Sequence, residues 1–429
     1  KNQTILVWDS TEPPSSGYSK VALWQSFDSQ LYPDAVSMPK IVEQNTDNLK
    51  NRYLKLIYNV GQIKLNSQSL IENFQLYPNF NYWWMTLLIE KSNWAKSPWI
   101  NDAIRMLAFE DWSVNQKIKK LELVTANTKL VKCFRLFCEK KNIMFKWQFI
   151  QEAKESQSAI KRIFHMLPKP IKALVWLGYY VYSRRLLKGV GIKEWESTKS
   201  KTTFVSYLFH LESEPASAGH FVSRYWVDLP DMILQEGIES NWLHLYVKGG
   251  VLPSDQKGSE IINILNRTCE GKQVHTTLDA FMSREVIWKT LIEWIGLFKI
   301  WIRIRTLDPS DLGGGYYIWP FIKMDLKESL FGQTAMNSLL YHNLFEQALK
   351  TLPKKERCFY LQENQGWEFG LIQAWKSEGN GEIIGVPHST IRFWDLRYFF
   401  DTRGYNDNIS KQLPRPDRVA VNGKAARDS

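Results

Sequence analysis

Apolar and polar positions along the chain follow two alternating patterns. Short apolar runs with strand-like composition recur at residues 4–8, 143–149, 203–209, 242–247, 274–278, 358–361 and 382–386. Longer stretches with helical spacing lie between them, at 48–65, 99–122, 127–141, 259–266, 284–305, 325–351 and 365–377. Strands that alternate with helices are typical of a mainly parallel sheet covered by helices. The pattern therefore predicts an α/β fold of the doubly wound, Rossmann-like class.

The same pattern suggests how the chain is divided. We expect residues 1–400 to form one Rossmann-like N-terminal domain, with helical insertions at about 155–200 and 284–320. The apolar run at 419–421 begins a fresh strand, so 401–429 should be a linker and the start of a second, truncated domain. Because the chain starts with Lys1 and stops soon after that strand, we expect the protein to continue beyond both ends.

Charge narrows the choice of partners. The chain has 55 Lys and Arg against 44 Asp and Glu, a net charge of +11, which favours nucleic acid, anionic lipid or phosphate-bearing small molecules. Its four cysteines lack metal-site spacing and the density of a disulfide scaffold, so we expect reduced thiols and a cytoplasmic protein without a bound metal.

A basic block at 160–188 favours lipid over nucleic acid. It contains seven Lys and Arg and no acid, arranged around the apolar run 173–182. That run is too short to cross a bilayer, which takes roughly 20 apolar residues. It predicts an amphipathic helix on an anionic membrane, which would make the protein peripheral on the inner face of the cell membrane. The alternative is a basic helical hairpin packed on the protein's own core.

A second unusual stretch, 286–304, is a Trp-rich helix. Its charged residues fall within one sector, and its remaining faces are apolar and must be buried. Burial in the protein interior and burial in a membrane or partner both remain open.

Several strands end in residues capable of catalysis. Asp9 follows the first strand, and Glu363 and His388 follow two later ones. In open α/β sheets the carboxyl ends of the strands line the ligand crevice, so these three residues are our candidates for the catalytic base.

Residues 358–400 contain most of the other candidates. A helix starting near Trp367 should point its N-terminal N–H groups toward the crevice, as a seat for phosphate. Of Arg392 and Arg397, at most one should face the site. The side chains that we expect to bind substrate are Asn364, Glu368, Ser389, Thr390, Arg392 and, from an upstream motif, His244. For Glu368 the alternative role is capping of the helix.

The motifs of this region resemble a known family. They are Glu-Asn-Gln-Gly-Trp-Glu at 363–368, Gly-Val-Pro-His-Ser-Thr at 385–390, Arg-Phe-Trp-Asp-Leu-Arg-Tyr at 392–398, Val-Ala-Val-Asn-Gly at 419–423, Tyr-Trp at 225–226 and Asn-Trp-Leu-His at 241–244. Together they look like the bacterial surface-carbohydrate biosynthesis proteins of O-antigen and capsule loci. The resemblance covers about 200–429 and is strongest at 358–400.

A more distant resemblance is to GT-B glycosyltransferases, which have two Rossmann-like halves with the site between them. It implies inverting, metal-independent transfer from a nucleotide-sugar donor, with CMP-linked sugars as one option, to a glycan or lipid-linked glycan acceptor. Beyond the donor no cofactor is expected. Two other functions remain open: a non-catalytic assembly protein of the same pathway and, less favoured, a nucleic-acid-binding protein.

Overall fold

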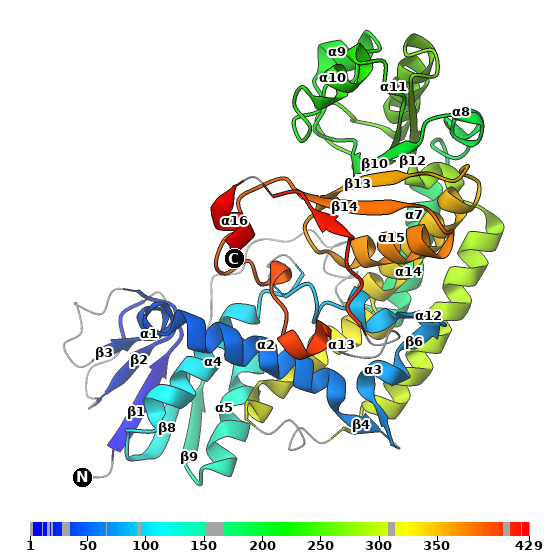
Figure 1. Ribbon diagram of the computed structural model, residues 1–429. Coiled ribbons are helices and arrows are strands. Elements are labelled where there is room, and N and C mark those ends of the chain that lie inside the picture. The colour runs from blue at the N-terminus through cyan, green and yellow to red at the C-terminus, as the bar shows by residue number, and fades with distance from the viewer. Residues whose placement is uncertain are drawn as a thin grey trace.

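The computed structural model (Figure 1) describes residues 3–10, 12–14, 18, 20–27, 35–65, 67–91, 96–150, 166–307, 314–405, 412–421 and 423–428. It is an α/β structure with two separate parallel sheets. All seven strands expected from the sequence are present.

The first sheet has five strands in the order β3-β2-β1-β8-β9, with every neighbouring pair parallel. The strands are β1 (Gln3–Trp8), β2 (Val21–Leu23), β3 (Ala35–Ser37), β8 (Ile118–Val124) and β9 (Met144–Gln148). This is the doubly wound strand order, in which the chain reverses direction across the sheet between the central strands β1 and β8.

Between the strands of this sheet the chain forms helices and short hairpins. They are α1 (Met38–Gln44), α2 (Thr46–Gln62), β4 (Lys64–Leu65), β5 (Gln68–Ser69), α3 (Leu70–Asn73), β6 (Gln75–Tyr77), β7 (Phe80–Asn81), η1 (Tyr82–Met85), α4 (Ile100–Ser113) and α5 (Thr128–Lys140). The helix expected at 99–122 ends early, at Ser113. From Ile118 the sequence alternates with period two, with Leu121 and Leu123 buried, and this alternation makes β8.

The second sheet has six strands in the order β12-β11-β10-β13-β14-β15, again all parallel. The strands are β10 (Thr202–Tyr207), β11 (Ser240–Leu245), β12 (Gln273–Thr277), β13 (Arg357–Gln362), β14 (Glu382–Pro387) and β15 (Arg418–Val419). Its reversal point lies between β10 and β13. Figure 1 shows the two sheets at opposite sides of the molecule.

A helical layer lies against the second sheet. It is built around α14, on which α7, α12, α13 and α15 pack. The helices and turns of this half are α7 (Lys169–Ser183), α8 (Ile192–Ser197), α9 (Ser213–Ser217), α10 (Leu229–Gln235), α11 (Asp255–Thr268), η2 (Leu278–Phe281), α12 (Arg284–Ile304), η4 (Tyr316–Ile318), α13 (Trp319–Phe331), α14 (Gln333–Lys350), α15 (Gly366–Ser377), η5 (Leu396–Tyr398), η6 (Thr402–Tyr405) and α16 (Lys424–Asp428). The helix expected at 325–351 is interrupted at Gly332, whose backbone is extended.

The single sheet expected for residues 1–400 is therefore wrong. The first sheet ends at β9, whose side chains are largely exposed, and the chain then passes through α7 and α8 before β10 begins a new sheet. The expected insertions correspond to α7 and α8 and to α12 and η4, although residues 155–165 and 308–313 lie outside the described residues.

The late strand was also misassigned. β15 pairs in parallel with β14 and so closes the edge of the second sheet instead of starting another domain. The two halves share one hydrophobic core, which includes Leu123 of the first sheet and Leu243 of the second. None of the helices in the described part of the chain combines the length and hydropathy that a bilayer crossing requires.

Candidate active site at the ends of two sheets

The reversal point of the second sheet brings together β10 and β13. A ligand of an open α/β sheet binds outside the carboxyl ends of its strands at such a point. There the side chain of Gln365 donates to the Tyr207 hydroxyl at 3.3 Å and to the Glu363 carboxylate. Tyr207 comes from β10 and Glu363 directly follows β13, so one amide links the ends of the two strands.

The turn after β13 is fixed by Glu368. This buried carboxylate accepts hydrogen bonds from the backbone N–H groups of Glu363, Asn364 and Gln365, at 2.9–3.1 Å. Burial raises the pKa of Glu368 to about 8, while the three N–H groups favour its ionised form. Glu368 thus caps α15, and substrate binding by it is a wrong prediction because its oxygens are already occupied.

The expected phosphate seat is also filled by protein. The N–H of Gly366, the first residue of α15, donates to the buried carboxylate of Glu90 at 2.9 Å. Glu90 comes from the segment after η1 and forms an ion pair with Lys96. The carboxylate of Glu90 therefore already interacts with the positive end of the α15 dipole, where a ligand anion would otherwise bind.

Glu363 and His388 do lie together. The His388 Nε2 is 3.4 Å from Glu363 Oε1, and both side chains are about one-fifth exposed. The Tyr225 ring meets the imidazole edge to face, with ring centres 5.0 Å apart. A carboxylate beside a partly exposed imidazole, braced by an aromatic ring, is an arrangement that can remove a proton from a hydroxyl group.

Of the two arginines, Arg397 is the one at the site. It forms two 2.8 Å hydrogen bonds with Asp395 and lies 3.9 Å from Glu363. The hydrogen bonds with Asp395 raise the pKa of Arg397 further above its usual value. Arg392 is exposed, and its expected role in substrate binding stays a prediction. One of the two arginines thus lies beside Glu363, as expected, although the segment between them is irregular and not a continuous helix.

The remaining candidates from this region, Ser389, Thr390 and Asn364, differ in their exposure to solvent. Ser389 and Thr390 are exposed after β14. Asn364 is buried and, with Tyr398, lines a pocket of about 320 Å³ that is bounded by Val419 and Arg427 of the returning chain. Asn364 thus remains a candidate for ligand contact.

Asp9 belongs to a different cluster, at the reversal point of the first sheet. Its carboxylate accepts from the Thr125 hydroxyl at 2.5 Å and the Gln25 amide at 2.7 Å. Nearby Asp102 accepts from Trp24 and Asn127, and burial raises the pKa of Asp102 to about 6. Asp9 is buried and follows a strand of the other sheet, so the structure does not bring it into the pair of Glu363 and His388.

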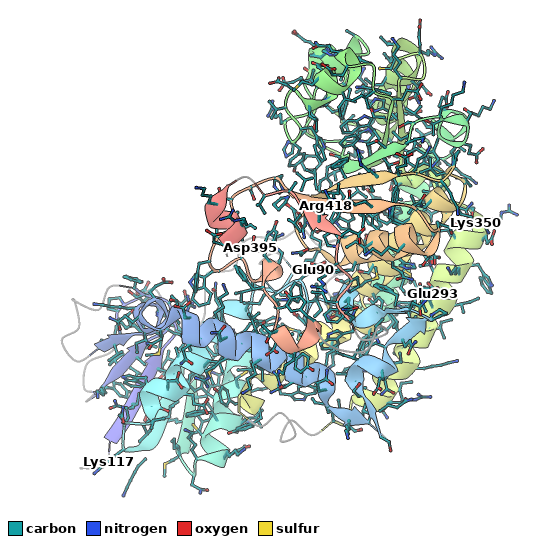
Figure 2. The ribbon with its side chains drawn as sticks, in the orientation of Figure 1. Glu90, Lys117, Glu293, Lys350, Asp395 and Arg418 are labelled. Atoms are coloured by element: carbon teal, nitrogen blue, oxygen red, sulfur yellow. The ribbon has the colours of Figure 1, made fainter. Side chains whose placement is uncertain are left out.

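Residues 388–405 run from the pair of Glu363 and His388 to α4, on which Arg105 lies 3.6 Å from Asp102 of the other cluster. This segment leaves β14 and crosses to the helices of the first half, where Trp394 lines a pocket of about 230 Å³ with Asn101 and Arg105 of α4. The Lys50 ammonium of α2 lies 3.1 Å from the centre of the Phe399 ring. Glu90 and Asp395, labelled in Figure 2, mark the region between the sheets that this segment crosses.

His244 is not a ligand residue. Its side chain is fully buried, with Nε2 3.1 Å from Nδ1 of His275 and its ring against Phe221. Burial lowers the pKa of His244 to about 3. The expectation failed because β11 is buried on both faces, so a polar residue at any position in it points into the core.

Sequence reasoning missed Tyr207, Tyr225 and Gln365 as members of the site. Tyr207 could have been found, since it ends a strand that the sequence identified, whereas Tyr225 lies in a loop and was noted only as part of the Tyr-Trp motif. Among the described residues, no group of three or more His, Cys, Asp or Glu side chains is placed to hold a metal ion.

Comparison of the chain with protein-family models, with curated proteins and with solved structures finds no match. The resemblance to surface-carbohydrate biosynthesis proteins stays a prediction from the sequence.

Proposed function

We propose that this protein is a glycosyltransferase that moves a sugar from a nucleotide-sugar donor to a glycan or lipid-linked glycan, with two Rossmann-like halves in the GT-B manner. One observation carries the proposal. Two parallel sheets, each in doubly wound order, have polar clusters at their reversal points, and residues 388–405 run from the second cluster to α4 beside the first. In this arrangement the second half is present within the chain, in contrast to our expectation of a truncated domain.

In this proposal His388 is the base, and Glu363 orients it. The acceptor hydroxyl oxygen attacks the anomeric carbon while its proton passes to the imidazole, and the bond from that carbon to the nucleotide phosphate breaks. Glu363, 3.4 Å away, orients the ring and offsets the positive charge that develops on it. Attack opposite to the leaving group inverts the anomeric centre.

The charge of the leaving nucleotide needs a cation. Arg397 stands at the end of the second sheet and Arg105 lines the pocket beside the first. Arg105 can bind phosphate oxygens in a bidentate way, whereas Arg397, which already donates through two nitrogens to Asp395, can offer its remaining N–H groups. Because protein carboxylates occupy the N-terminus of α15, we assign binding of the leaving phosphate to an arginine and not to that helix.

The test measures nucleotide release from CMP-, UDP-, GDP- and dTDP-sugars with a lipid-linked oligosaccharide acceptor. Glu363→Gln and His388→Ala should each lower the rate by about 10²- to 10⁴-fold. His220→Ala is a matched control, because His220 is an exposed histidine that also has an acidic partner, Asp231. Absence of release from every donor, or parental rates in both folded variants, would refute the proposal.

A further inference from the structure

The outward face of α7 is apolar. Ala173, Leu177 and Tyr180 are buried against the protein. The opposite face exposes roughly half or more of five apolar or aromatic side chains, Ile171, Leu174, Val175, Tyr179 and Tyr182. Packing on the protein's own core, the alternative drawn from the sequence, therefore describes only one face of α7. Residues 160–165 of the basic block lie outside the described residues.

α12, which like α7 packs on α13 and α14, has the same character. Trp294, Leu297 and Trp301 are buried, while the face turned outward exposes Trp288, Ile292, Ile295, Phe298 and Ile302. Its charged sector is partly turned inward, because Lys289 pairs with Glu346 and Glu293 accepts from Asn343, both on α14. The Trp-rich helix is thus half interior and half exposed.

A lysine cluster lies on α5, α7 and α13, beside Trp301 of α12. α7 and α12 each pack on α13 and α14. Lys327 of α13 lies 5.5 Å from the Trp301 ring of α12, and Lys169 of α7 pairs with Glu328 of α13. The other members are Lys129, Lys132 and Lys323.

These lysines are close enough to repel one another. Besides burial, the charges of Lys132, Lys327 and Lys169 lower the pKa of Lys129. Burial lowers the pKa of Lys327 as well, together with the charges of Lys323, Lys169 and Lys132. A cluster of like charges costs free energy in the isolated protein and is relieved by an anionic partner.

From this placement we infer that α7, α12 and the lysine cluster of residues 129, 132, 169, 323 and 327 form a docking surface for an anionic membrane. Contiguous exposed apolar faces, such as those of α7 and α12, mark interaction sites. Cations beside apolar, Tyr- and Trp-bearing faces suit the headgroup region of an anionic bilayer. The surface would hold the protein beside lipid-linked molecules, but the inference does not depend on sugar transfer.

The experiment is co-sedimentation of the full chain with vesicles of phosphatidylcholine containing phosphatidylglycerol, or of phosphatidylcholine alone. The parent should bind the anionic vesicles and lose binding as salt is raised. A charge variant, with Gln replacing Lys129, Lys132, Lys323 and Lys327, should bind up to about 10³-fold more weakly, since each cation near the bilayer surface contributes roughly a factor of five. An apolar variant, Leu174→Gln with Trp288→Gln and Ile292→Gln, should also lose binding.

The matched control removes the same charge elsewhere. Gln replaces Lys193, Lys199, Lys248 and Lys272, which are exposed around the second sheet, and binding should stay near that of the parent. Three results would overturn the inference: no binding by the parent, equal loss in the control, or parental binding by both variants. A parent that forms dimers dispersed only by the apolar variant, without vesicle binding, would assign the face to a second copy of the chain instead.

Discussion

The carboxylate of Glu90 accepts a hydrogen bond from the backbone N–H of Gly366 at 2.9 Å and joins segments that are 276 residues apart. Gly366 is the residue at which α15 begins, directly after the turn that presents Glu363. A Cβ at Gly366 would lie 2.9 Å from the Met85 carbonyl oxygen, so only glycine allows this approach. The position of the candidate base therefore depends on a residue from the first half of the chain.

Replacing Glu90 with Gln should lower the free energy of unfolding by about 1–3 kcal/mol, because a buried charge-assisted hydrogen bond is weakened and Lys96 loses its partner. Urea unfolding at pH 7 measures the change. Glu139→Gln, at an exposed position on α5, is the control and should change it by less than about 0.5 kcal/mol. Equal effects of the two substitutions would contradict the role given to Glu90.

Much of the site could be predicted from the order of strands and their final residues. Glu363 and His388 were placed together because parallel strands end at one edge, and the pairing of β13 with β14 confirms it. Burial could not be predicted in the same way. Glu368 and His244 are polar residues in the right region, but only the packing around them shows that backbone N–H groups occupy the first and that the core encloses the second.

The division into sheets depended on long-range pairing. Nothing in the local pattern of 143–149 and 203–209 distinguishes two strands of one sheet from the last strand of one sheet and the first of another. The structure separates them because β9 is largely exposed and β10 pairs with β11 and β13. The sequence could not choose Arg397 over Arg392 for a similar reason, since the contact of Arg397 with Glu363 arises in an irregular segment without periodicity.

Asn364 offers a test of the turn itself. Its φ is 54°, in the left-handed region, and its side-chain oxygen accepts from Gln362 at 3.0 Å. Asn364→Gly should lose only the hydrogen bond, about 0.5–1.5 kcal/mol. Asn364→Ala should lose about 1–2 kcal/mol more, since alanine is strained in this conformation. Thermal unfolding of both variants gives the ranking, and an alanine variant as stable as the glycine variant would show that the turn is not held as described.

Lys91 is a buried lysine whose replacement should stabilise the protein. Its ammonium donates to the Ile89 carbonyl at 3.1 Å and lies 3.7 Å from the Phe400 ring centre, and burial lowers the pKa of Lys91 to about 7. Lys91→Met keeps the unbranched stem and removes the cost of burying a charge, so the free energy of unfolding at pH 7 should rise by about 1–4 kcal/mol.

The pH dependence of the parent checks the same point. Because the folded pKa of Lys91 lies below the unfolded value of about 10.4, the unfolded chain binds more protons between these values and stability rises with pH. From pH 7 to 9 the difference between Lys91→Met and the parent should therefore shrink. Urea unfolding at both pH values measures it, and a constant difference would mean that Lys91 stays charged throughout.

His342 should make the protein sensitive to acid. Its ring is fully buried and stacks on Tyr77, with ring centres 4.3 Å apart, and on Phe80. Burial lowers the pKa of His342 to about 4, although the charge of Glu346, 3.9 Å away, acts in the opposite direction. In the unfolded chain the pKa is about 6.5, so between pH 4 and 6.5 the unfolded state binds the extra proton. The contribution of His342 is thus complete above pH 6.5 and is lost as the pH falls toward 4, at up to about 1.4 kcal/mol per pH unit.

His342→Phe keeps the stacking and removes the proton, so its unfolding free energy should fall less steeply with acid than that of the parent. The remaining slope belongs to groups such as His244 and His275, whose pKa values are also lowered by burial. Urea unfolding at pH 4.5, 5.5 and 6.5 measures the two slopes, with exposed His220→Gln as the control that should follow the parent. Parallel curves for parent and His342→Phe would show that this histidine is not held neutral in the folded protein.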